Sequence, residues 1–173
     1  MVDPGVEGAH VTVIDRLVAH NASKGASNKA HMDRRPRWSL ALVTCMDCRI
    51  DVYEAFGLAL GDVHVLRNAG GIVTDDTIRS LVVSQRSLGT RLVMVVHHTD
   101  CGLHRLDETA FKAGIVEAVG KDLPFDIGAF EDLDAEVRES MRRITDSPFV
   151  AEHGAVRGFV YDVDSGMVRE VQI

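Results

Sequence analysis

The stretches LALVTCMDCR (residues 40–49) and LVMVVHHTDC (residues 92–101) decide the fold of this chain. In each, a short apolar run leads directly into side chains that can bind a metal. Such a run, bounded by polar residues and rich in Val and Leu, is typical of a strand buried in a parallel sheet. Cysteine sulfur and histidine nitrogen are ligands that zinc prefers, at roughly 2.0–2.3 Å. We therefore predict two neighbouring strands whose carboxyl ends share a zinc site of the Cys-His-Cys kind.

The length and composition indicate a soluble globular protein. We expect one domain over residues 1–173, with residues 1–37 forming an N-terminal helix and arm. The net charge of −7 argues against a nucleic-acid partner, because phosphate binding needs a basic surface. No apolar run approaches the ~18–20 residues of a membrane span, and the N-terminus lacks the features of a signal peptide. We therefore expect a cytoplasmic protein without a membrane partner.

Hydrophobic periodicity and turn residues predict strands that alternate with helices. We expect helices over residues 11–20, 51–60, 75–88, 108–119 and 130–144, and strands over residues 38–44, 63–66, 91–96, 156–163 and 167–173. Gly61 and Gly89 are expected to end the second and third helices, and Thr74 to cap the third.

This alternation indicates an α/β fold with a mainly parallel sheet, helices on both faces and an added C-terminal hairpin strand. The zinc argument places the first strand beside the third, and the crossover rule then gives the strand order 2-1-3-4. That order reverses between the first and third strands, where open α/β sheets bind their ligands. The predicted metal site therefore lies in this crevice.

Five side chains are candidate zinc ligands: Cys45, Cys48, His97, His98 and Cys101. Successive strand residues point to opposite faces, so only one of the two histidines is expected to join Cys101 on a metal. His98 has the spacing H-x-x-C, which a tight turn can fold onto one ion, but spacing does not decide between the two. Reduced cysteines are the rule in the cytosol, so a metal or catalytic role is favoured over a disulfide.

Two further pairs belong to the predicted site. Asp47 and Arg49 lie two residues apart, and an arginine beside an aspartate favours the ionised carboxylate. Directly after a metal-binding cysteine, we interpret this pair as an orienting dyad and not as an ordinary surface pair. Gly70 and Gly71 follow the second strand and let the backbone turn tightly and approach a ligand closely. We expect them to contribute to substrate binding.

Three motifs together resemble those of the β-class carbonic anhydrases: Cys45-x-Asp47-x-Arg49, the stretch RNAGG (residues 67–71), and His98-x-x-Cys101-Gly102. The resemblance covers residues 38–102, and the short chain is similar to the smaller, bacterial and archaeal branch of the class. The combination is specific, since each of the outer motifs follows a predicted buried strand.

The resemblance implies an activity and a set of residue roles. Cys45, His98 and Cys101 would bind one zinc ion per subunit, and Asp47 and Arg49 would form the catalytic dyad. The reaction would be the reversible hydration of carbon dioxide to bicarbonate and a proton by zinc-bound hydroxide, which makes the enzyme a lyase. Because two thiolates offset the charge of the ion, we expect the activity to rise with pH above neutrality. The resemblance also implies a homodimer or a dimer-built tetramer, with helices of one subunit packed on the other.

Two departures from the family pattern keep alternatives open. Cys48 occupies a position that is commonly small, and Leu42 stands where some members have a tryptophan beside a second bicarbonate pocket. One alternative is hydrolysis of carbonyl sulfide or carbon disulfide on the same scaffold. Another is a non-catalytic zinc module closed by Cys45, Cys48, His98 and Cys101. A C-x-x-C redox protein is a third, but it leaves the other motifs unexplained.

Overall fold

A computed structural model describes residues 7–24, 29, 31–151 and 156–173, which fall into two compact units, Met1–Asp33 and Arg34–Ile173. The first unit contains α1 (Glu7–Ser23), which confirms the helix predicted over residues 11–20 and extends it at both ends. Its apolar residues Val13, Ile14, Leu17 and Val18 are exposed. Part of the loop predicted over residues 21–37 lies outside the described residues, and the single-domain assignment stays a prediction.

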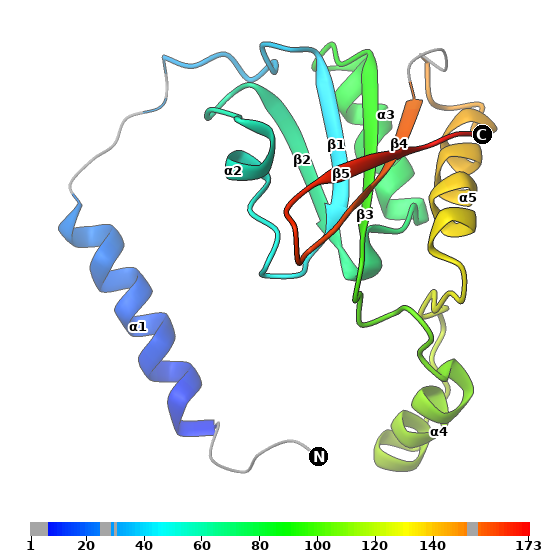
Figure 1. Ribbon diagram of the computed structural model, residues 1–173. Helices are drawn as coiled ribbons and strands as arrows, with labels where there is room; N and C mark the ends of the chain where they lie inside the picture. Colours follow the sequence, from blue (N-terminus) through cyan, green and yellow to red (C-terminus); the bar gives the residue numbers. More distant parts are fainter. Residues whose placement is uncertain (1–6, 25–28, 30, 152–155) are drawn as a thin grey trace. The chain divides into compact units, whose positions relative to one another are not determined.

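The second unit is built on a five-stranded sheet in the order β2-β1-β3-β4-β5 (Figure 1). The strands are β1 (Leu40–Cys45), β2 (Val63–Asn68), β3 (Leu92–His98), β4 (Val156–Tyr161) and β5 (Val168–Val171). The first four are parallel, and β5 pairs antiparallel with β4 across the predicted turn. The predicted order 2-1-3-4 with a C-terminal hairpin strand is therefore confirmed.

Four helices and one short 3-10 turn connect these strands. They are α2 (Val52–Phe56), η1 (Ala69–Gly71), α3 (Asp75–Arg86), α4 (Glu108–Val119) and α5 (Leu133–Thr145). The side chain of the residue before each α-helix accepts a hydrogen bond from a backbone N–H of the first turn: Asp51, Thr74, Asp107 and Asp132. These caps satisfy donors that a helix start leaves free.

Three predicted helix ends were wrong. α2 ends at Gly57, whose φ of 63° is left-handed, and the predicted stop at Gly61 lies in the following turn. α3 ends before Ser87, two residues earlier than a stop at Gly89 requires. α5 begins at Leu133 and not at residue 130, because the Asp132 carboxylate caps the helix there.

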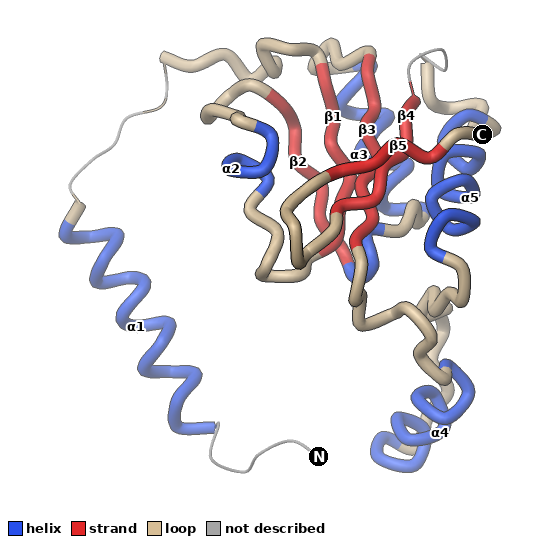
Figure 2. The backbone as a smooth tube through the Cα atoms, viewed as in Figure 1, coloured by secondary structure: helices blue, strands red, loops and turns tan. Residues whose placement is uncertain are grey.

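The two faces of the sheet bury separate apolar clusters, as alternation along a strand requires. On one face, Leu81 of α3 and Ile144 of α5 pack against a layer from the central strands: Ala41, Val43, Val93 and Val95. On the other face, Val52 of α2 belongs to a cluster with Leu42 and Val96. In Figure 2 the strands are red and form the central layer, and the helices are blue. Helices on both faces are thus confirmed.

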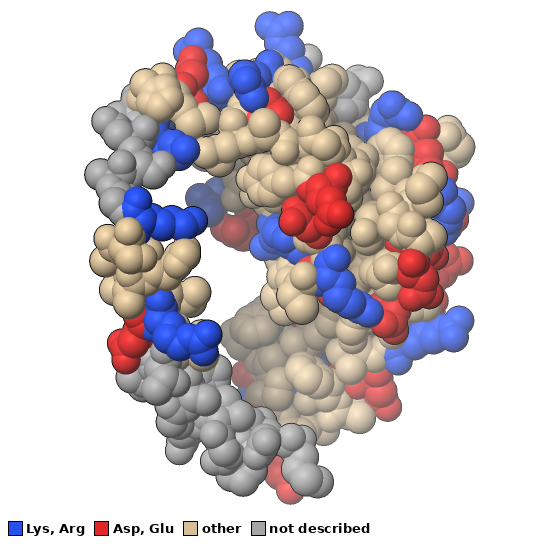
Figure 3. Space-filling model, turned by 60° about the vertical axis from the view of Figure 1, so that its left-hand side comes forward, with Lys and Arg blue, Asp and Glu red and all other residues tan. Residues whose placement is uncertain are grey.

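The surface carries charges of both signs. On the face shown in Figure 3, Lys and Arg side chains alternate with Asp and Glu and form no continuous basic area. Among the helices that the structure describes, none combines the length and the apolar character that crossing a bilayer requires.

Candidate active site

The structure brings three of the five candidate ligands together. Cys45 ends β1, His98 ends β3, and Cys101 follows in the turn after β3. All three are buried, and one ligand atom from each lies within 4.8 Å of the others. Tetrahedral zinc with bonds of ~2.0–2.3 Å separates its ligand atoms by roughly 3.3–3.8 Å, so small side-chain shifts close the site around the ion. The carboxyl ends of β1 and β3 therefore supply a set of donors suited to zinc.

The hydrogen bonding of His98 prepares one ring nitrogen for a metal. Its Nδ1 lies 2.8 Å from the Thr99 carbonyl oxygen, which can only accept, so Nδ1 carries the proton. The other nitrogen, Nε2, is buried and has no hydrogen-bond partner within the described part of the chain. A buried acceptor without a partner is costly, and a metal ion would satisfy it. This nitrogen and the two sulfurs fit a zinc ion.

The two cysteines of this group, Cys45 and Cys101, differ in their affinity for a proton. The sulfurs of Cys45 and Cys101 lie within 4.8 Å of each other, and interaction with the Cys101 thiol is the main reason that the pKa of Cys45 is lowered. The nearby His98 ring and the Asp47 backbone N–H lower the pKa of Cys45 further, against the effect of burial. The same interaction and burial raise the pKa of Cys101. Zinc binding must therefore displace a proton from Cys101.

The remaining two candidates lie apart from this group. His97 points to the opposite face, where its Nε2 lies 3.3 Å from the Ser140 hydroxyl of α5. Burial lowers the pKa of His97 to about 4, so its ring is neutral near pH 7. Cys48 is exposed and does not belong to the group of metal-binding atoms found among the described residues.

Asp47 and Arg49 form a tight pair beside the ligands. The backbone N–H and Nε of Arg49 donate to Asp47 Oδ1 at 2.9 and 3.0 Å, and Nη2 donates to Oδ2 at 2.7 Å. These hydrogen bonds hold the pKa of the Asp47 carboxyl well below its usual range. Asp47 Oδ2 lies 4.0 Å from His98 Nε2. An ionised carboxylate is therefore placed at the edge of the metal-binding group.

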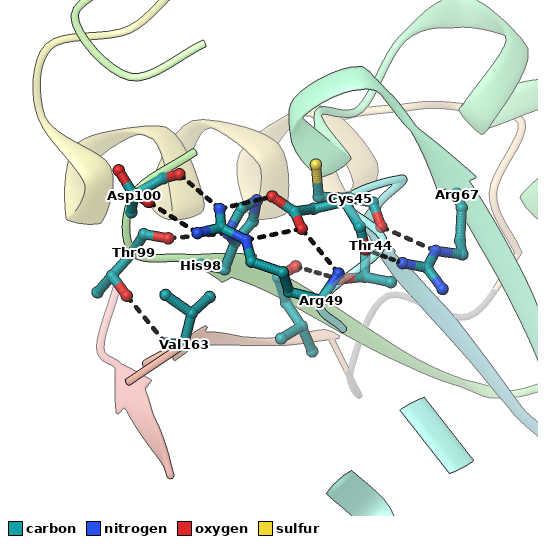
Figure 4. Close-up of polar contacts among 10 residues, drawn as sticks. Thr44, Cys45, Arg49, Arg67, His98, Thr99, Asp100 and Val163 are labelled. Atoms are coloured by element: carbon teal, nitrogen blue, oxygen red, sulfur yellow. Dashed lines mark hydrogen bonds and ion pairs between the residues drawn. The ribbon is translucent and has the colours of Figure 1, made fainter. Parts of the chain in front are cut away.

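Two residues without a role in the sequence interpretation hold the ends of β1 and β3. The Arg67 guanidinium donates to the carbonyl oxygens of Cys45 and Asp47 at 2.8 and 2.6 Å (Figure 4). The buried Thr44 hydroxyl donates to the Val96 carbonyl at 2.8 Å. The sequence signal for Arg67 was its place in the stretch RNAGG, but neither contact follows from residue spacing.

The two glycines of that stretch adopt left-handed backbone conformations, with φ of 75° at Gly70 and 70° at Gly71. A Cβ atom on Gly71 would lie 2.7 Å from the Cys45 nitrogen and 2.8 Å from the Thr44 carbonyl carbon. The turn therefore packs directly against the backbone of β1 where the metal ligand begins. The contribution of these glycines to substrate binding stays a prediction.

A mainly parallel α/β sheet that gathers two cysteines and a histidine at its switch point places a candidate metal site where open α/β sheets bind their ligands. The family model described as carbonic anhydrase matches residues 40–124. Beta-carbonic anhydrase 1 of Mycobacterium tuberculosis is 43% identical over 161 residues, which cover 93% of this chain and 99% of that protein.

The solved structures and a second group of relatives extend the comparison. The crystal structure of carbonic anhydrase from Streptococcus mutans has a TM-score of 0.82 and 40% identity, and covers 99% of this chain and 100% of that one. A carbon disulfide hydrolase of Saccharolobus solfataricus is 50% identical over 80 residues, which cover 45% of this chain and 37% of that protein. The chain therefore belongs to the β-class carbonic anhydrases.

Proposed function

We propose that Cys45, His98 and Cys101 hold one zinc ion per subunit and that this site catalyses the reversible hydration of carbon dioxide to bicarbonate and a proton. Two observations carry the proposal: a ring nitrogen of His98 lies within 4.8 Å of two cysteine sulfurs, and its Nε2 is buried without a hydrogen-bond partner among the described residues. When bound, zinc supplies a Lewis acid that lowers the pKa of a water molecule and makes it a nucleophile.

The residues around the ligands orient that reaction. Asp47 stays ionised because Arg49 donates three hydrogen bonds to its carboxylate, so it can only accept. It accepts a hydrogen bond from the attacking water and directs the lone pair of that water at the carbon of the substrate. Arg49 also holds Asp47 at a distance from the metal-binding atoms. If this pair broke, Asp47 could itself become the fourth ligand and close the site.

The test is a measurement of zinc content together with hydration rate across pH on one preparation. We expect one zinc per chain and a rate of carbon dioxide hydration that rises above neutrality. Because carbon disulfide hydrolases are among the relatives, hydrolysis of carbonyl sulfide and carbon disulfide should be measured in parallel. Zinc-loaded protein that acts only on the sulfur compounds would overturn the proposed substrate, and protein that binds no zinc would overturn the site.

We also propose a homodimer or a dimer-built tetramer. β2 lies at an edge of the sheet and pairs only with β1 among the described strands, and such edges are commonly covered in native proteins. The exposed apolar residues of α1 also favour a covered helix, because natural surfaces limit apolar patches. Light scattering after size-exclusion chromatography should give at least twice the monomer mass of 18.9 kDa. A monomer at micromolar concentration would contradict this.

A cytoplasmic location is proposed for a chemical reason. Zinc binding needs both ligand cysteines as thiolates, and reducing compartments keep thiols from forming disulfides. Cell fractionation with an antibody against the chain tests this location, and recovery outside the cytoplasmic fraction would contradict it.

A further inference from the structure

We propose that Asp100 is a positioning residue for the hydration reaction. It holds the side of the Arg49 guanidinium that faces away from Asp47, and through Arg49 it fixes the direction of the Asp47 carboxylate. The inference rests on the proposed function, because it assigns Asp100 a part in the same site.

The guanidinium of Arg49 lies between two carboxylates. Its Nη1 donates to Asp100 Oδ2 at 2.7 Å, and its Nη2 donates to the Asp100 carbonyl oxygen at 2.9 Å (Figure 4). The same Nη2 and the neighbouring Nε donate to Asp47. Asp47 follows β1 and Asp100 follows β3, so Arg49 connects the two turns that follow the strands ending in Cys45 and His98. A planar guanidinium held at both ends has no free rotation left.

The backbone at Asp100 makes it a firm anchor. Its φ of 54° is left-handed, a conformation that Asp and Asn tolerate better than most residues. The preceding residue is held from both sides: Thr99 N–H donates to the Tyr161 carbonyl at 3.0 Å, and Val163 N–H donates to the Thr99 hydroxyl at 3.0 Å. The next residue is the ligand Cys101. The backbone that carries Asp100 is therefore held directly beside the metal-binding group.

Stability alone does not explain this contact. The Asp100 side chain is 78% exposed and that of Arg49 is 45% exposed, and exposed ion pairs add little to folding free energy. Without Asp100, Arg49 would still pair with Asp47, but the pair could turn as a unit away from the attacking water. Small errors in the placement of a catalytic group are costly in rate. The role of the contact is therefore orientation.

Two substitutions preserve the backbone conformation and separate the possible roles. Asp100→Gly removes the carboxylate and suits a left-handed φ, whereas Asp100→Asn keeps an oxygen that can accept from Arg49. We expect kcat/KM for carbon dioxide hydration to fall about tenfold in Asp100→Gly and to stay within about twofold in Asp100→Asn. Zinc content and thermal midpoint should match those of the wild type in both variants. Zinc loss in parallel with activity would overturn the positioning role.

Asp76→Ala serves as a matched control, and an Arg49→Gln background tests whether Asp100 acts through Arg49. Asp76→Ala removes another exposed carboxylate, 74% exposed and paired with Arg79, and should leave kcat/KM unchanged. In an Arg49→Gln background, Asp100→Gly should cause no further loss, because Asp100 acts only through Arg49. An undiminished further loss in that background, or full activity of Asp100→Gly in the wild-type background, would overturn the proposal.

A measurement without catalysis separates this inference from the proposed function. Solvent exchange of the Arg49 Nη1 protons, which face Asp100, should be several-fold faster in Asp100→Gly than in the wild type when followed by NMR. Equal exchange rates would contradict the anchoring role whether or not the protein hydrates carbon dioxide. Conversely, faster exchange in Asp100→Gly, together with a wild-type protein that does not hydrate carbon dioxide, would support the contact of Asp100 with Arg49 and contradict the proposed function.

Discussion

The proposed metal ligands and the Asp47–Arg49 pair beside them are adjacent but are held in different ways. Cys45, His98 and Cys101 are between 1% and 7% exposed, and the ends of buried strands place them. The side chains of Asp47 and Arg49 are 17% and 45% exposed, and mainly hydrogen bonds to each other and to nearby turns hold them. The buried strand ends therefore position the residues proposed to bind the metal. A partly exposed network of hydrogen bonds positions the pair proposed to orient the attacking water.

The largest effect is expected when one of the three buried residues proposed to bind zinc is removed. We expect Cys101→Ala to lose zinc and all activity, because a nitrogen and one sulfur cannot hold the ion in a stable tetrahedral site. Elemental analysis of the purified variant measures the zinc.

Cys48→Ser is the matched control for that experiment. Its exposed thiol lies outside the ligand group, so zinc and activity should be retained. Zinc loss in Cys48→Ser would instead favour a structural module closed by four protein ligands.

Changing the dyad should separate catalysis from metal binding. Asp47→Asn keeps the shape of the side chain but removes the charge that accepts from the attacking water. We expect kcat/KM to fall by at least about a hundredfold, within the range of general acid–base groups, while zinc content is unchanged. A variant that loses zinc along with activity would show that the two regions are not independent.

The turn at Gly70 and Gly71 packs against the end of β1, and a substitution there tests how much this contact contributes to stability. In Gly71→Ala, the new methyl group meets the backbone of Thr44 and Cys45 at a left-handed φ of 70°. We expect the free energy of unfolding to fall by about 2–4 kcal/mol, from strain and overpacking together. Gly89→Ala is the control, because its φ is 76° but no atom lies within 4 Å of the added carbon. Urea denaturation that gives equal losses for both variants would reject the close contact.

The smallest effect is expected at a carboxylate remote from the ligands. Glu108 on α4 pairs with Lys112 and accepts from two backbone N–H groups, which lowers its pKa from 4.5 to about 2. A lowered pKa stabilises the fold above pH 4.5, and this contribution is lost as the pH falls toward 2. Glu108→Gln should therefore lower the thermal midpoint near pH 7 and converge with the wild type in acid.

A variant on the same helix provides the control for that measurement. Glu117→Gln changes an exposed carboxylate of α4, and its thermal midpoint should stay close to that of the wild type at both pH values. Hydration activity near neutral pH should be unchanged in Glu108→Gln. An effect of Glu108→Gln that grows in acid would contradict the direction of the pKa shift.

The strand order could be predicted because the candidate zinc ligands at the ends of two strands can meet only if those strands are neighbours. Two runs that end in zinc donors must lie side by side, and the crossover rule then left one arrangement. The helix ends were harder. Gly57 and Gly61 both have positive φ, so residue type alone does not show which of them ends α2.

The site was predictable in its residue types but not in its network. Motif spacing gave five candidate ligands and the Asp47–Arg49 pair, since these lie close in sequence to strand ends, and the family resemblance selected Cys45, His98 and Cys101 among them. The contact of Arg49 with Asp100 joins residues 51 positions apart and depends on one left-handed turn. Arg67 reaches back across 22 positions to the Cys45 carbonyl. Such contacts depend on strand register, which a single sequence does not specify at this level.

The exposed position of Cys48 gives the molecule a built-in reporter of metal loading. Of its three cysteines, two are buried in the proposed metal site and the third is exposed to solvent. Brief alkylation should therefore add one label to zinc-loaded protein and three after chelation and unfolding. Intact mass spectrometry would then count the loaded fraction in a sample, chain by chain, without any assay of turnover.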